Sequence, residues 1–131
     1  MRLLLDTHIW LWTLLAPTKL GRRVRGEIAR AKNEVWLSPV SAWELLLLAE
    51  RGRLDLGNDA GKWVADAVSH TPAHEAALTF DVAIRSREVM PSHPDPADRF
   101  LVATALVNDL TLVTADERLI DARCCQVLAN R

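Results

Sequence analysis

Four acidic residues stand where the chain passes from one predicted element to the next: Asp6, Glu44, Asp98 and Asp116. Asp6 directly follows the apolar run Arg2–Leu5, and Asp116 lies just beyond a second apolar run. Glu44 and Asp98 fall in the first turns of two predicted helices. Carboxylates at such junctions can cap helices or hold metal cations, so these four residues are the first candidates for chemistry.

Each acid taken alone has a structural interpretation. Three segments have the spacing of a capping box, in which side chains satisfy the free N–H groups of the first helical turn: Ser41–Glu44, Asp95–Asp98 and Thr114–Glu117. Asp116 would be an additional acid inside the last of these boxes. Capping boxes are common, so no single motif among them establishes a functional site.

Capping does not explain why acids from distant segments should gather at one end of a sheet. In an open parallel sheet, ligands bind beyond the carboxyl ends of the strands, where the strand order reverses. Carboxylates gathered there would repel one another in a partly dry cleft, which raises their pKa values unless cations are present. Mg²⁺ or Mn²⁺ suits such oxygen ligands and can activate a water against a phosphodiester. Together, the acids predict metal-dependent phosphoryl chemistry.

The elements that would position these acids alternate between short apolar runs and helical periodicity. Strands are expected at Arg2–Leu5, Val35–Leu37, Leu110–Val113 and Gln126–Leu128. Helices are expected over 8–15, 20–32, 41–52, from 58 or 59 onward, 79–88, 96–108 and 116–121. This alternation predicts one α/β domain over residues 1–131, a three-layer α/β/α sandwich around a central, mainly parallel sheet.

Several other site classes are excluded by the motifs. The chain has five glycines and no G-x-G-x-x-G, and the segment Gly57–Trp63 has too short a spacing, and a Trp in place of Ser or Thr, for a phosphate loop. A G-x-S-x-G nucleophile elbow is also missing. Pro72 separates His70 from His74 and prevents the helix that would align them as metal ligands. We interpret the four histidines, including His8 and His93, as surface or packing residues.

The charge distribution is more informative than the net charge of −1. Residues 1–65 hold ten Lys or Arg and seven acids, whereas residues 66–131 hold six and ten. The segment Lys19–Lys32 concentrates six of the basic residues, and on a helix they form either a solvated face or a surface that steers phosphates. The residues that would face RNA in the second interpretation are Arg22, Arg23 and Arg25.

Targeting and redox signals favour the cytoplasm. The start of the chain imitates a signal peptide, but its apolar stretch would have to contain Asp6 and His8. Apolar runs are too short to span a membrane, so we expect no membrane partner. Cys124 and Cys125 are adjacent and are the only cysteines, which indicates a reduced protein. Trp10 and Trp12 are two residues apart, splay by about 200° on a helix, and are interpreted as packing residues.

Four ordered blocks of the sequence resemble the signature blocks of PIN-domain ribonucleases, and most closely those of VapC-type toxins. The blocks read LLDTH at 4–8, SPVSAWE at 38–44, DPADR at 95–99 and LVTAD at 112–116. The resemblance implies a compact α/β fold and a metal-dependent endoribonuclease that uses Mg²⁺ or Mn²⁺. It also implies a cognate antitoxin that holds the enzyme inactive, a homodimer, and a larger complex with the antitoxin.

Carried over block by block, the resemblance implies that Asp6, Glu44 and Asp98 are the principal metal-binding acids. Asp116 would be the fourth, acting through water, and Thr114 would be a polar neighbour of the site. Asp95 is interpreted as a helix cap. Two further residues could support the site: Arg99, which could pair with a site carboxylate or a substrate phosphate, and Glu117.

Two alternatives belong to other functional classes. A receiver-type phospho-acceptor domain also carries an acidic Mg²⁺ pocket, but it needs an acid pair on the first strand, an acceptor Asp after the third and a Lys after the last. Here the first strand offers only Asp6, and no Lys occurs beyond Lys62. The other alternative is a non-catalytic PIN-like binding module in which the acids are only caps.

Overall fold

Five parallel strands form one sheet with helices on both faces. The structure, a computed structural model, describes residues 1–131. The strand order is β3-β2-β1-β4-β5, and every neighbouring pair is parallel. The strands are β1 (Arg2–Leu5), β2 (Glu34–Leu37), β3 (His74–Glu75), β4 (Thr111–Thr114) and β5 (Val127–Ala129). The prediction of an α/β/α sandwich is confirmed, with a sheet that is wholly parallel.

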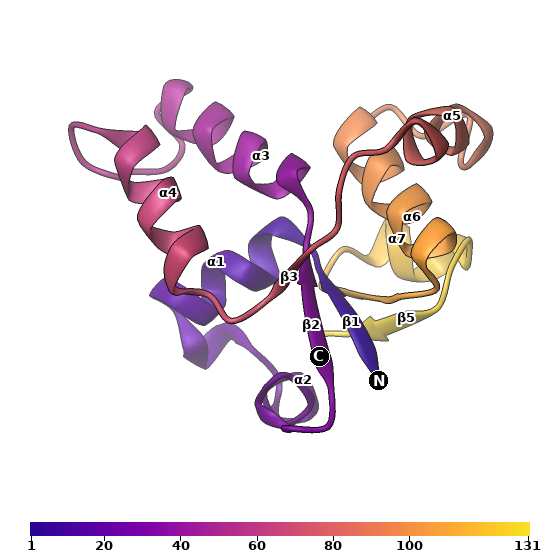
Figure 1. Ribbon diagram of the computed structural model, residues 1–131, viewed down its shortest axis with the longest axis horizontal. Helices are drawn as coiled ribbons and strands as arrows, with labels where there is room; N and C mark the ends of the chain where they lie inside the picture. The colour runs from indigo at the N-terminus through magenta and orange to yellow at the C-terminus, as the bar shows by residue number, and fades with distance from the viewer.

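Helices cover the two faces in separate groups. In Figure 1, α1, α3 and α4 lie on one side of the sheet, and α5, α6 and α7 lie on the other. The helices are α1 (Thr7–Leu15), the 3₁₀ turn η1 (Pro17–Lys19), α2 (Arg22–Ala29), α3 (Pro39–Glu50), α4 (Ala60–His70), α5 (Phe80–Glu88), α6 (Pro96–Asn108) and α7 (Glu117–Ala122). No helix is both long enough and apolar enough to cross a bilayer.

Strand β1 supplies side chains to two separate hydrophobic cores. Successive side chains of a strand point to opposite faces, so Leu3 and Leu5 enter one core while Leu4 enters the other. The first core joins Leu3 and Leu5 to Ile9, Trp10, Val24, Leu45 and Val64, among others. The second joins Leu4 to Leu101, Val102, Ala105, Leu112 and Leu119, among others. Burial on both faces explains why this strand reads as a continuous apolar run.

The chain order reverses at the centre of the sheet. From β1 the chain moves outward to β2 and β3, and then crosses over to β4 and β5 on the other side of β1. The reversal lies between β1 and β4, whose carboxyl ends carry Asp6 and Thr114. Ligand sites of open parallel sheets form at such a point. The observed order also differs from the receiver order 2-1-3-4-5, so the receiver alternative is wrong.

Two of the three expected capping boxes are wrong. Helix α3 begins a turn earlier than expected, because Pro39 occupies the first helical position and the Ser38 hydroxyl accepts the Val40 N–H at 3.1 Å. Thr114 belongs to β4, and Asp116 itself caps α7 by accepting the Arg118 N–H at 2.9 Å. Glu44 is therefore free of capping and can face a site.

Other boundaries differ for local reasons. Helix α2 ends at Ala29 rather than at residue 32, because the Asn33 side chain donates to the Glu27 carbonyl and closes the helix. The short strand β3 was not expected, since two exposed residues give no apolar pattern. The third expected cap is confirmed: Asp95 accepts the Ala97 N–H at 2.9 Å at the start of α6.

Truncation of the buried strand tests the core assignment. Leu4 is fully buried, so we expect Leu4→Ala to lower the free energy of unfolding by about 2–5 kcal/mol through lost burial and a residual cavity. Leu15→Ala, at a side chain that is 53% exposed on α1, should change it by less than about 0.5 kcal/mol. Urea unfolding measures both, and equal losses would contradict the two-core arrangement.

Candidate active site

All four predicted acids line one pocket at the carboxyl ends of β1 and β4. The pocket has a volume of about 270 Å³. Its lining comes from the starts of α1, α6 and α7 and from the middle of α3: Asp6, His8, Trp12, Glu44, Asp95, Asp98, Ala115, Asp116 and Arg118. A larger groove of about 780 Å³ between α3 and α4 contains none of the four acids.

Asp6 is the innermost acid and is held from two sides. It caps α1 by accepting the Thr7 N–H at 2.7 Å, and its other oxygen accepts the Thr114 hydroxyl at 2.6 Å. Its own N–H donates to the Val113 carbonyl, which extends the pairing of β1 with β4 by one residue. Burial raises the pKa of Asp6, although both hydrogen bonds act in the opposite direction.

Glu44 reaches the pocket from α3. The Thr7 hydroxyl donates to its Oε1 at 2.6 Å and lies 3.0 Å from the buried Ser41 hydroxyl. Burial raises the pKa of Glu44 to about 7, and the charges of Asp6, Asp95 and Asp98 add to this effect. The side chain is therefore partly protonated at neutral pH when no cation is present.

Asp98 lies in the first turn of α6 and is only 6% exposed. His93, from the loop before the helix, places Nε2 at 2.9 Å from its Oδ2. Burial raises the pKa of Asp98 to about 6, and repulsion by neighbouring acids contributes, despite the opposing hydrogen bond with His93. Asp98 and Glu44 thus carry the same kind of electrostatic strain.

Asp116 differs because a cation already compensates it. Arg118 donates through Nε to Oδ1 at 3.2 Å and through Nη2 to Oδ2 at 2.8 Å. This forked contact lowers the pKa of Asp116. The same Nη2 lies 3.7 Å from Asp98 Oδ2, so Arg118 extends over the rim of the pocket.

The donor set fits a hard divalent cation. Three carboxyls with raised pKa values share one pocket, and a bound cation would relieve both their repulsion and their desolvation. As the side chains stand, no three of them surround a single point closely enough to hold an ion. The residues able to turn toward an ion are Asp6, Glu44, Asp98 and Asp116.

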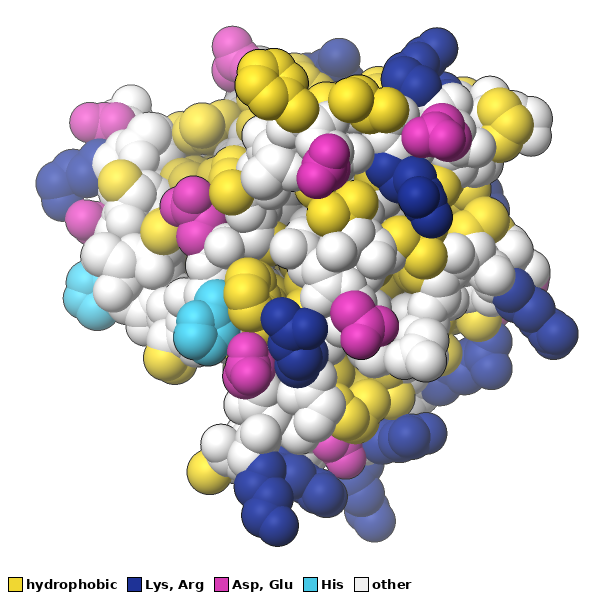
Figure 2. All heavy atoms as spheres, turned by 45° about the vertical axis from the view of Figure 1, so that its right-hand side comes forward, with side chains coloured by type: hydrophobic (Ala, Val, Ile, Leu, Met, Phe, Trp, Pro, Cys, Tyr) yellow, Lys and Arg dark blue, Asp and Glu magenta, His cyan; other side chains and the backbone are white.

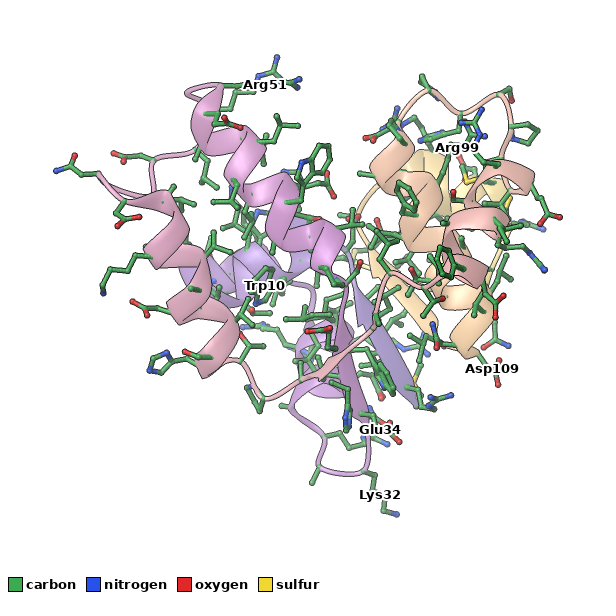
Figure 3. The ribbon with its side chains drawn as sticks, turned by 45° about the horizontal axis from the view of Figure 1, so that its top comes forward. Trp10, Lys32, Glu34, Arg51, Arg99 and Asp109 are labelled. Atoms are coloured by element: carbon green, nitrogen blue, oxygen red, sulfur yellow. The ribbon has the colours of Figure 1, made fainter.

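Other residues predicted for the site lie in different surroundings. Thr114 contacts Asp6 directly. Arg99 instead points to α5, where it donates to the Ser86 carbonyl at 3.2 Å (Figure 3). Glu117 is largely exposed and pairs with Arg131 outside the pocket. The three α2 arginines do not line the pocket: Lys and Arg side chains gather toward the lower end of the molecule (Figure 2), the end where α2 lies in Figure 1.

Sequence reasoning missed several side chains that touch the acids or line the pocket with them, among them Thr7, His8, Trp12, His93 and Arg118. His93 lies in a loop with three nearby prolines, where no periodicity relates it to Asp98. Arg118 had a readable signal, since it follows Asp116 by two residues at a helix start. His8 and Trp12 are four residues apart on α1 and share a face.

Comparison with known proteins identifies the family. The PIN domain family model matches residues 3–123. The chain belongs to the PIN domain family. This PIN domain is 33% identical over 117 residues to Ribonuclease VapC22 of Mycobacterium tuberculosis, and the match covers 88% of each chain. The resemblance seen in the sequence blocks is thus confirmed.

Solved structures share the fold of this PIN domain. VapBC2 from Rickettsia felis, bound to a promoter DNA fragment, matches with a TM-score of 0.73 and 12% identity over the whole of both chains. DNA-bound VapBC from Salmonella typhimurium matches with a TM-score of 0.72 and 14% identity over 98% of both chains. At these identities the similarity demonstrates a common fold.

The raised pKa of Glu44 predicts a pH-dependent stability of this PIN domain. A carboxyl with a higher pKa in the folded than in the unfolded state binds its proton more tightly when folded. Its contribution to stability is therefore present at low pH and is lost as the pH rises from about 4.5 to about 7. Glu44→Gln keeps an acceptor for Thr7 and removes the charge. It should be more stable than wild type by about 1–2 kcal/mol at pH 8, after allowance for partial exposure.

Urea unfolding in EDTA across this pH range measures the effect. Glu50→Gln, at an exposed acid on the same helix, is the matched control and should follow the wild-type profile. A Glu44→Gln variant that is no more stable than wild type at high pH would show that the acids do not strain the fold.

Proposed function

We propose that this PIN domain is a Mg²⁺- or Mn²⁺-dependent endoribonuclease that hydrolyses RNA phosphodiester bonds. The observation that carries the proposal is the convergence of four acids from four distant segments on one pocket, where burial and repulsion raise the pKa of three of them. Capping accounts for Asp6 and Asp116 only in part, and it accounts for Glu44 not at all. Similarity to Ribonuclease VapC22 supports RNA as the substrate.

In this proposal Asp6, Glu44 and Asp98 hold the cation, and Asp116 acts as the fourth acid. The bound ion would supply positive charge for the scissile phosphate and an activated water. Thr114 keeps one Asp6 oxygen in place, and Thr7 does the same for Glu44. These hydroxyl contacts orient the two carboxylates in the metal-free pocket, and side-chain rotation would then bring the acids to a common ion.

Basic residues that could contact RNA lie at the rim of the pocket and on α2. Arg118, exposed and already directed at the acids, can exchange Asp116 for a substrate phosphate without a change in the backbone. The α2 arginines, which do not line the pocket, remain our proposal for a separate RNA-facing surface.

We further propose that a cognate antitoxin neutralises the enzyme and that the toxin forms a homodimer within a larger complex. Support comes from VapBC toxin–antitoxin structures of the same fold, including VapBC-5 from Mycobacterium tuberculosis with a TM-score of 0.60. The two free, adjacent cysteines support action in the cytoplasm.

Charge-neutral substitutions test the acids. We expect Asp6→Asn and Asp98→Asn each to reduce RNA cleavage at least about 100-fold while the fold is retained, because each removes an anionic ligand. Asp109→Asn is the matched control, since it makes the same change at an exposed left-handed residue after α6, where Asn fits equally well. Gel assays with Mn²⁺ and with EDTA measure cleavage. Undiminished cleavage by both pocket variants would overturn the site.

Metal binding is expected to stabilise the folded protein independently of activity. At a Mn²⁺ concentration 100-fold above the dissociation constant, wild type should gain about 2.7 kcal/mol. Asp6→Asn should gain much less, and Asp109→Asn should gain as much as wild type. Thermal unfolding with Mn²⁺ or EDTA measures this, and an equal response of all three proteins would place the ion elsewhere.

Expression in cells tests the partner. Wild type should stop growth, Asp6→Asn should not, and co-expression of the cognate antitoxin should restore growth to the wild-type strain. Growth arrest that persists with the antitoxin bound, or that Asp6→Asn also causes, would contradict the toxin–antitoxin assignment.

A further inference from the structure

Trp12 and His8 form an aromatic wall of the acid pocket that metal binding does not explain. Both residues line the pocket with the acids, one turn apart on α1. Their ring centroids are 6.0 Å apart and the planes are tilted by 58°. His8 is exposed and Trp12 is half-buried, so this pair offers an apolar, π-rich surface beside the carboxylates.

Helix geometry explains why Trp12 occupies this position. Trp10 and Trp12 splay by about 200° on α1. Trp10 is 1% exposed, lies within the first hydrophobic core and donates its indole N–H to Thr71. Trp12 packs against the outside of that core, is only partly buried, and lines the pocket. Because Trp10 rather than Trp12 fills the core, part of the Trp12 indole is left available for a ligand.

A positive charge lies over the indole of Trp12. Lys19, in the 3₁₀ turn after α1, is exposed and places Nζ over the Trp12 ring, 5.6 Å from its centroid. It is the first residue of the basic segment 19–32, and although it does not line the pocket itself, it contacts Trp12, which does. An aromatic surface next to a lysine is how proteins bind single-stranded nucleic acid, through base stacking and a phosphate contact.

We propose that the His8–Trp12 surface stacks one unpaired nucleobase next to the scissile phosphate, while Lys19 contacts a phosphate of the same strand. The inference rests on the proposed ribonuclease function and assigns His8, Trp12 and Lys19 to the binding of one nucleotide of its RNA. Stacking accepts any base because every base has a π face, so the surface requires a base without selecting its identity. Trp12 is then a substrate-binding residue as well as a packing residue.

The test begins with the wild-type protein, whose cut position is mapped on an RNA that it cleaves. The same RNA, as a fluorescent 12-mer, is then bound to the Asp98→Asn protein, which should leave it intact. Oligonucleotides with one abasic nucleotide on either side of the cut report where a base is needed. One of them should bind about 5- to 150-fold more weakly than the intact RNA.

Adding Trp12→Ala to the same protein completes a double-mutant cycle. Trp12→Ala should weaken binding of the intact RNA by a similar factor, and the abasic RNA should then bind no more than about twofold more weakly than the intact one. Trp12→Phe should retain most of the affinity, since a ring still stacks. Phe80→Ala is the control, because this aromatic side chain is 90% exposed on α5 and does not line the pocket; affinity should change by less than twofold.

Each outcome decides the proposal. The proposal is overturned if the losses of affinity from Trp12→Ala and from the abasic nucleotide multiply in the double variant. It is also overturned if the Trp12→Ala protein binds intact RNA as tightly as its parent. In both cases cleavage by the wild type would still support the proposed function. A wild type that cleaves no RNA would instead overturn the proposed function, and the stacking surface with it. If Trp12→Ala fails to fold by circular dichroism, Trp12→Leu keeps the apolar packing and removes the π face for the same cycle.

Discussion

A hydrogen bond between two residues 108 positions apart joins the parts of this structure that matter most. Thr114 donates to Asp6 at 2.6 Å across the boundary between β4 and β1, where the strand order reverses. Asp6 also caps α1, so one carboxylate ties a helix start to two strands. A buried acid is tolerated only where such donors satisfy it, and both donors here come from fixed elements of the fold. The remaining acids are positioned relative to this point.

The acids of the pocket are electrostatically unfavourable where they stand. Burial and mutual repulsion raise the pKa of Asp6, Glu44 and Asp98, whereas the forked contact with Arg118 lowers the pKa of Asp116. A fold selected for stability alone would have little reason to gather these charges, because each raised pKa reduces stability at neutral pH. A divalent cation reverses this balance, since it turns repulsion among the acids into attraction to a shared charge. The strained pocket therefore indicates function.

The sequence predicted those parts of the fold that depend on local pattern. The apolar run Arg2–Leu5 and the Asp95-Pro96 helix start are strong signals, and both elements are where they were expected. Glu44 was predicted as a site acid, but the Ser41 spacing also predicted a capping box for it, and that box is wrong because Pro39 and Ser38 begin the helix earlier. The four acids were predictable because parallel strands bring their carboxyl ends together.

Their partners could not be predicted in the same way. Contacts of His93 with Asp98 and of Thr7 with Glu44 depend on how loops and helices pack in three dimensions. Arg99 was expected at the site because it adjoins Asp98, but residues adjacent on a helix point in different directions, and it bonds to α5. The position of Trp12 at the pocket could not be predicted from the sequence, because the spacing of Trp10 and Trp12 does not show which of them is buried. The structure shows that Trp10 is the buried one.

Anomalous diffraction from crystals soaked in Mn²⁺ tests the central claim most directly, because it locates the ion without reference to activity. The account predicts an anomalous peak within the pocket, with carboxylate oxygens of Asp6 and Asp98 at bonding distance. A saturating soak that leaves the pocket without a peak, with the acids still engaged by Thr114 and His93, would contradict it.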